Sequence, residues 1–117
     1  MKIQIFDTET MLELLTQTAI EQYILSGSEA EDTVCGLINI AEVMEQEGAI
    51  TAEQLGMLKN AIVEWKQEDQ QIPMPEKPDA LKVQDSIEWL EDFLKGKDNP
   101  ILQDVKQFYM DYWMTIL

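Results

Sequence analysis

The chain lacks several residue types on which enzyme chemistry commonly depends. Its 117 residues include no His, no Arg and a single Cys, Cys35. Without His, neither a Ser-His-Asp nor a Cys-His arrangement can form, and zinc sites built from His and Cys are excluded. One Cys cannot form an intramolecular disulfide, and a lone thiol is typical of a reducing compartment. We therefore expect no catalytic residues, no bound metal and no cofactor.

Signals for export or membrane insertion are also lacking. The opening MKIQIFDTETMLELL has one Lys followed by early acids, which is unlike a secretory signal. No apolar run approaches the ~18 residues that a membrane-spanning helix needs. We expect a cytoplasmic protein that makes no contact with membranes.

Negative charge is abundant and unevenly spread. The chain has 23 Asp and Glu residues against 8 Lys, a formal net charge of −15. Residues 1–58 hold eleven of the acids and only Lys2 as a base. This charge repels nucleic acid, and the absence of Arg removes the bidentate fork that best recognises phosphate. The expected partner is therefore a basic protein, with no direct binding of nucleic acid.

The apolar content is sufficient for one core. Hydrophobic residues make up 45% of the chain and include 3 Trp, 3 Tyr, 3 Phe and 7 Met. A chain of this length suits a single domain, so we expect residues 1–117 to form one acidic helical domain. Residues 70–79, QQIPMPEKPD, contain three prolines, which exclude regular helix and predict an extended crossover within that domain.

Helical periodicity and capping signals predict an all-α, irregular bundle of about five helices. Ser28 with Glu31, and Thr51 with Gln54, match the capping box that opens a helix. Asn99, followed directly by Pro, matches the start of the last helix. The short link after the second helix favours a hairpin with the third. The expected elements are a short extended segment at 2–6 and helices near 8–26, 28–47, 51–69, 79–95 and 100–117.

Apolar spacing also predicts which side of each helix faces the core. In the first helix we expect Glu13, Gln17 and Glu21 to face water. Cys35, beside the inner stripe of the second helix, is expected to be a small buried hydrophobe. The inward stripe predicted for the fifth helix is Ile101, Val105, Phe108, Tyr112 and Ile116.

Two patterns resemble cation sites but match them incompletely. Val43–Gln54 has the central glycine of an EF-hand loop, yet Val and Gln replace its first and last ligands. Glu42 with Glu45, and Glu88 with Glu91, have the spacing of the magnesium-binding acids in all-helical nucleotide pyrophosphohydrolases. The second acidic pair of those enzymes has no counterpart at the required spacing. A solvated acidic face explains these pairs, and a magnesium-dependent nucleotide hydrolase is the least favoured of three hypotheses.

The favoured hypothesis is a non-enzymatic, protein-binding module with a carboxylate surface. Acids spaced along helices imitate the phosphates of DNA and steer a basic, nucleic-acid-binding protein toward them. In composition the chain is similar to small acidic inhibitors of phages and mobile elements, such as anti-restriction and anti-CRISPR proteins, which act in an infected bacterial host. The alternative is that the acids only maintain solubility. The candidate contact residues are Glu29, Glu31, Asp32, Glu42, Glu45, Glu47 and Glu53.

The C-terminal segment supports a second hypothesis. Residues 108–117, FYMDYWMTIL, hold eight apolar residues in ten, more than one helix face can bury. They form either a helix enclosed by the other four or an exposed patch. A patch would bind another protein or a second copy of the chain, giving a homodimer or larger homo-oligomer. The candidate patch is Tyr109, Met110, Trp113, Met114 and Leu117.

Overall fold

Helices account for nearly all of the chain that the computed structural model describes, which is residues 7–67 and 79–116. No strand occurs within these two ranges, so the expected all-α class is confirmed. The extended segment expected at 2–6, and all but the last residue of the crossover, lie outside the described residues. The elements are α1 (Thr8–Ser26), a 3-10 helix η1 (Gly27–Ala30), α2 (Glu31–Gln46), α3 (Ala52–Gln67), α4 (Ala80–Leu94) and α5 (Pro100–Ile116).

Two helix starts follow their sequence signals closely. At α3, the Thr51 N–H donates to Gln54 Oε1 at 2.9 Å, and the Gln54 N–H donates to Thr51 Oγ1 at 3.1 Å. This reciprocal pair is the predicted capping box. At α5, Asn99 Oδ1 accepts from the Ile101 N–H at 3.0 Å, and Pro100 is the first helical residue. Both predicted starts are confirmed. They could be predicted because the hydrogen bonds that define them join residues close in sequence.

The start of α2 differs from the prediction. Gly27 has a φ of 58°, and the chain passes through η1 before α2 begins at Glu31. Ala30 occupies the N-cap position and has no side-chain oxygen, so the capping box expected from Ser28 does not form. Ala30 is instead buried in the core. Tertiary packing therefore sets this helix end where capping was expected to do so.

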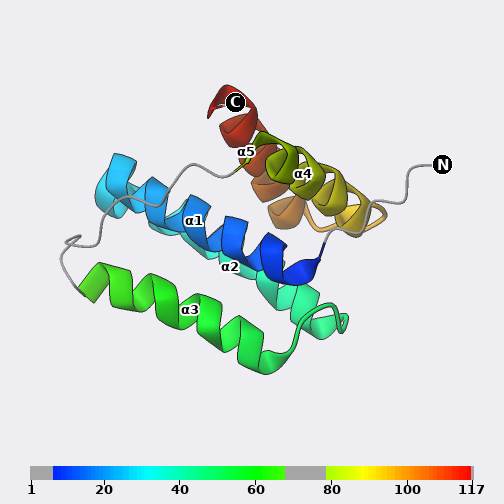
Figure 1. The fold of residues 1–117 in the computed structure, drawn as a ribbon, viewed down its shortest axis with the longest axis horizontal. Coiled ribbons are helices and arrows are strands. Elements are labelled where there is room, and N and C mark those ends of the chain that lie inside the picture. The colour runs from blue at the N-terminus through cyan, green and yellow to red at the C-terminus, as the bar shows by residue number, and fades with distance from the viewer. Residues whose placement is uncertain (1–6, 68–78, 117) are drawn as a thin grey trace.

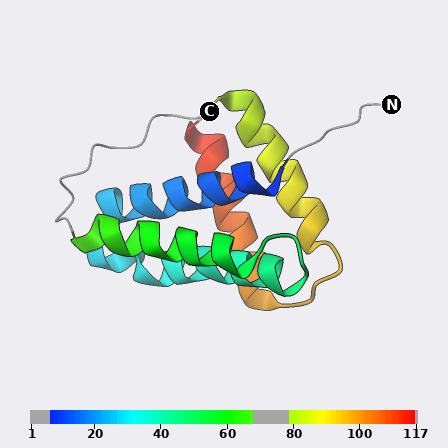
Figure 2. The ribbon, with the colours of Figure 1, turned by 60° about the horizontal axis from the view of Figure 1, so that its bottom comes forward.

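Three antiparallel helices lie side by side, and a helical hairpin packs across them (Figure 1). α1 contacts both α2 and α3, and α2 contacts α3, which confirms the predicted hairpin. α5 crosses α2, while α4 contacts α5 and α1 (Figure 2). The Cα radius of gyration is 13.8 Å, close to the ~13 Å of a compact domain of about this size. All five helices share one hydrophobic cluster.

The buried face of α5 matches the one predicted from its apolar spacing only in part. Val105 and Tyr112 of the predicted stripe are half-buried and pack against the core, but Ile101 is 57% exposed. The fully buried residues described in α5 are Leu102, Tyr109 and Trp113, each one position after a member of that stripe. The reason is tertiary: α5 contacts both α2 and α4, and in this orientation its two largest buried rings have polar partners.

Those polar partners are hydroxyl groups on two other helices. Tyr109 OH lies 2.9 Å from Ser86 Oγ on α4, and Trp113 Nε1 donates to Thr18 Oγ1 on α1 at 2.9 Å. Ser86 and Thr18 each donate in turn to a backbone carbonyl of their own helix, both at 2.7 Å. Because the Ser86 proton is used in that bond, Tyr109 is the donor to it. Burial raises the pKa of Tyr109, which keeps its phenol protonated.

The water-facing side predicted for α1 is wrong for two of its three residues. Glu13 is exposed, but Gln17 is half-buried and Glu21 is buried. α1 contacts α2, α3 and α4, so little of its circumference is left for solvent. In α2, Cys35 is exposed and is not the buried hydrophobe that its position suggested.

Gly36 determines how closely α2 and α5 approach. A Cβ at this position would lie 2.3 Å from Val105 Cγ2, a separation that real Cβ atoms do not tolerate. The two helices therefore meet where one of them has no side chain, as at other close helix contacts. Gly56 in α3 offers a comparison, because a Cβ there meets nothing within 4 Å.

Gly36→Ala is expected to lower the free energy of unfolding by about 1–3 kcal/mol, because Val105 or the helices must shift. The gain in helix propensity, about 1 kcal/mol, offsets only part of this cost. Gly56→Ala is the matched control and should stabilise by about 0.5–1 kcal/mol. Urea unfolding of both variants measures the difference. A Gly36→Ala protein as stable as Gly56→Ala would show that the α2–α5 contact is not close.

Candidate partner-binding surface

The seven predicted acidic contact residues do not form one patch. Glu29, Glu31 and Asp32 lie in η1 and the first turn of α2. The others lie near the far end of α2 or at the start of α3. The nearest members of the two groups on α2, Asp32 and Glu42, are separated by roughly 15 Å along the helix axis, about two Debye lengths at physiological salt. Salt therefore screens the two groups from each other. The distal group consists of Glu42, Glu45, Glu47 and Glu53.

Glu47 is already engaged within the protein. Its carboxylate lies 3.1 Å from Lys97 Nζ, and Lys97 also donates to the Phe93 carbonyl and lies 4.2 Å from the centre of the Phe93 ring. Both ends of the ion pair are partly exposed, so it is worth only about 0.2–1 kcal/mol. It nevertheless ties the end of α2 to the α4–α5 turn and leaves Glu47 less available to a partner than Glu53.

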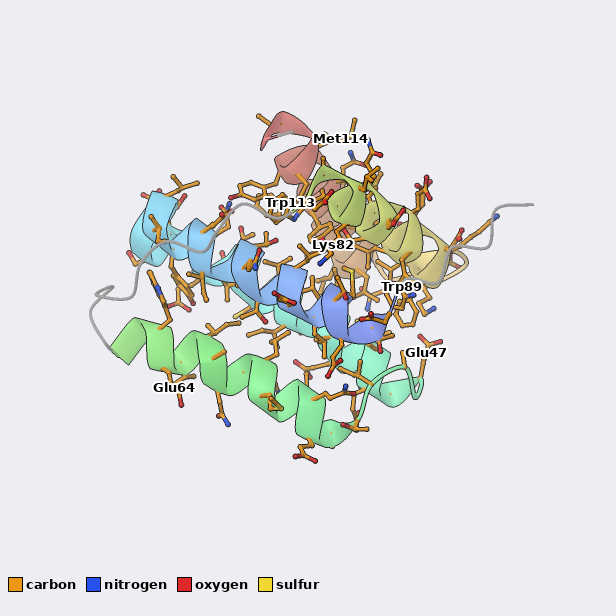
Figure 3. All side chains as sticks on the ribbon, viewed as in Figure 1. Glu47, Glu64, Lys82, Trp89, Trp113 and Met114 are labelled. Carbon is orange, nitrogen blue, oxygen red and sulfur yellow. The ribbon has the colours of Figure 1, made fainter. Side chains whose placement is uncertain are left out.

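The predicted aromatic patch is largely part of the core. Tyr109 is 0% exposed and Trp113 is 1% exposed, and Trp113 points from α5 toward α1 (Figure 3). Met110 is half-buried, and Leu117 lies outside the described residues. Only Met114, 64% exposed, presents an apolar surface among the patch residues that are described. Tyr109 and Trp113 therefore do not belong to an exposed patch. α5 is not enclosed by the other four helices either, because it packs mainly against α2 and α4 and leaves Met114 exposed.

A buried acid and a tyrosine form a contact that the sequence did not indicate. Tyr112 OH donates to the carboxylate of Glu21, joining the last turns of α5 and α1. Burial raises the pKa of Tyr112, and the hydrogen bond and charge of Glu21 raise it further. The protonated phenol is thus the form that fits this site. Glu21 is consequently a structural residue, although the sequence placed it on a solvated face.

Tyr112→Phe is expected to lower the free energy of unfolding by about 1.5–3 kcal/mol, because it leaves the buried Glu21 carboxylate without its donor. Glu21→Gln should cost less, about 0.5–1.5 kcal/mol, because an amide oxygen still accepts the hydrogen bond. A double-mutant cycle by urea unfolding should give a coupling energy of about 1 kcal/mol or more. Strictly additive effects would mean that the two groups do not interact.

A groove between α1 and α3 has an apolar floor. Leu12 and Leu58 form the floor and are 8% and 4% exposed, while Met57 stands at the side and is 66% exposed. The volume is about 420 Å³, within the range of about 300–1,000 Å³ typical of ligand sites. Glu9 and Glu13 are both exposed. The lining residues are Glu9, Leu12, Glu13, Thr16, Gln17, Gln54, Met57 and Leu58.

One lining residue, Gln17, has a side-chain oxygen without a partner. Gln17 Oε1 is buried beneath the surface and accepts no hydrogen bond within the part of the chain that the structure describes. Buried acceptors are nearly always satisfied, so an orphaned one needs a physical reason. The sequence indicated neither this atom nor Met57 and Glu9 as functional, and it assigned Glu13 and Gln17 to a solvated face. The groove itself combines an apolar floor with a negative rim.

No protein-family model, curated protein or solved structure matches the chain. Within residues 7–67 and 79–116, no three Cys, Asp or Glu side chains gather as ligands for a metal ion. None of the helices in those ranges has the length and apolarity needed to cross a membrane. The function is accordingly inferred from the distribution of charge and apolar surface alone.

Proposed function

We propose that this protein is a non-enzymatic binding module that presents carboxylates to a basic, nucleic-acid-binding site of a partner protein and so inhibits or regulates it. In this respect it resembles the small acidic anti-restriction and anti-CRISPR inhibitors of phages, which work in the cytoplasm of an infected bacterium. The observation that carries the proposal is that Glu21 is the only acid buried in the described part of the chain. The other described acids remain at least partly accessible.

This distribution favours attraction of a cationic surface. A formal charge of −15 on a molecule with few accessible Lys residues produces a strong negative field outside it. Such a field speeds the encounter with a basic partner and repels nucleic acid and other acidic proteins. The homo-oligomer hypothesis is weakened on the same grounds, because two copies repel each other and the aromatic side chains assigned to their contact are enclosed.

Capture from a host lysate tests the proposal. Immobilised protein should retain a basic partner at low salt and release most of it near 0.5 M salt, where the Debye length is roughly 4 Å. With the purified partner, the association rate should fall steeply with salt while the dissociation rate changes little.

Two charge variants locate the contact. One changes Glu29, Glu31 and Asp32, in η1 and the first turn of α2, to their amides. The other changes Glu42, Glu45 and Glu53, toward the end of α2 and at the start of α3, so each variant loses three charges. Both should slow association, because the overall field decreases. Retention of the same proteins at low and at high salt would contradict a charge-driven function. So would an association rate that neither variant changes.

A further inference from the structure

We propose that the outer face of α3 binds a second copy of this chain, with the two α3 helices parallel and in register. The outer face is the side of α3 turned away from α1 and α2, and it consists of Ala52, Gly56, Asn60 and Val63. This contact is separate from the aromatic patch on α5 that the sequence indicated. It also goes beyond the proposed function, because it uses none of the acids on α2.

α3 lies at the edge of the molecule and has one side available to another protein. It packs against α1 and α2, with Leu58, Ile62 and Trp65 buried (Figure 1). On the outer face, Asn60 is exposed and Val63 is 48% exposed. A single exposed valine does not identify a partner. The charges along the edges of this face, and the glycine within it, point to a second copy.

The first observation is the charge of α3. Glu53 and Glu64 contribute two negative charges, and Lys59 and Lys66 contribute two positive charges. Of the five α-helices in residues 7–67 and 79–116, α3 is the one without net charge, whereas the other four are negative. At physiological salt, charges beyond about 8 Å are largely screened. The repulsion between two copies is therefore smallest at an α3–α3 contact.

The second observation is the placement of these charges on opposite edges of the outer face. At about 100° per residue, Glu53 and Glu64 lie about three turns apart along one edge, and Lys59 lies along the other. All three side chains are exposed. In a parallel two-fold pair, the acidic edge of each copy faces the edge of its partner that carries Lys59. Antiparallel pairing would place acid against acid, so the face is self-complementary in one direction only.

The third observation concerns two residues in the middle of the face. A Cβ at Gly56 would meet nothing within 4 Å, so packing within the protein does not require glycine there. Glycine nevertheless destabilises a helix interior relative to alanine, and the close approach of a second helix accounts for it. Asn60 follows one turn later and meets the same residue of the other copy when the helices are in register. A single Asn at such a contact favours a parallel pair.

The contact area sets the expected strength. α3 has 16 residues and is therefore roughly 24 Å long and about 10–12 Å wide. A contact of this size buries less than the ~800 Å² per partner of a standard interface. We expect a weak dimer with a Kd of about 10–100 µM.

Sedimentation equilibrium in about 0.15 M salt, at protein concentrations of about 10–500 µM, tests the inference. The mean mass should rise from 13.5 kDa toward twice that value. Lys59→Glu and Glu64→Lys should each weaken the dimer by about three- to tenfold, although the first adds negative charge and the second removes it. The double variant should bind within about twofold of the parent, and so should the control Lys82→Glu on α4.

Gly56→Ala separates a role in pairing from a role in folding. The monomer should become more stable, but the dimer should weaken by about tenfold because the added methyl groups hold the helices apart. A thiol crosslink tests the register. Asn60→Cys in a Cys35→Ser background should form a disulfide-linked dimer on mild oxidation, because the two thiols then lie within reach of each other. Glu64→Cys in the same background should not.

Four results would overturn the inference. These are a monomer at every concentration, no effect of Lys59→Glu, changes in Kd that follow net charge alone, or crosslinking of Glu64→Cys in preference to Asn60→Cys. Capture of a salt-sensitive basic partner by a protein that stays monomeric would refute the α3 contact and support the proposed function. A dimer with these variant effects, and no such partner, would support the α3 contact and contradict the proposed function.

Discussion

Two buried hydroxyl groups fix the position of the last helix. Thr18 on α1 and Ser86 on α4 each accept a hydrogen bond from an aromatic side chain of α5. Each hydroxyl also donates a hydrogen bond to a backbone carbonyl of its own helix. The polar side-chain atoms of Tyr109, Trp113, Ser86 and Thr18 therefore all have hydrogen-bond partners. This pairing offsets the cost of burying the two aromatic side chains.

The placement of α5 determines much of the remaining architecture. With its rings directed at α1 and α4, the side carrying Val105 meets Gly36 on α2, and Tyr112 reaches Glu21. The aromatic residues that seemed available for a partner are thus used inside the protein. What remains outside is mostly carboxylate, so any specific contact must combine charge with the limited apolar surface that is left, such as the α1–α3 groove.

Local signals predicted the starts of α3 and α5, whereas tertiary packing determined the start of α2 and which helix faces are buried. Thr51 with Gln54 and Asn99 with Pro100 are recognisable because their hydrogen bonds span three residues or fewer. The orientation of α5 could not be read from a segment that is apolar all round, since its burial depends on hydroxyls on α1 and α4 that are distant in sequence. In α1 the sequence did indicate burial on more than one side. Its run of Met11, Leu12, Leu14 and Leu15 covers too much of the helix circumference for a single buried face.

The sequence predicted the charge of the expected partner but not the residues that form a contact surface. The net charge alone indicated a basic partner, yet the seven acids chosen along α2 proved to belong to two separate groups. The α1–α3 groove depends on which residues of two helices face each other, and sequence spacing does not specify this. Gln17 lies between Thr16 and Thr18, so the sequence does not distinguish it from an ordinary surface residue.

The free energy of unfolding of Trp113→Ala, measured in urea beside Met114→Ala, tests most directly whether α5 is a core helix. The two side chains are adjacent in sequence, but one is 1% exposed and the other 64% exposed. Burial of the inner face of α5 predicts a loss of about 3–5 kcal/mol for Trp113→Ala and about 0.5 kcal/mol or less for Met114→Ala. A Trp113→Ala protein that unfolds like the parent would contradict the account.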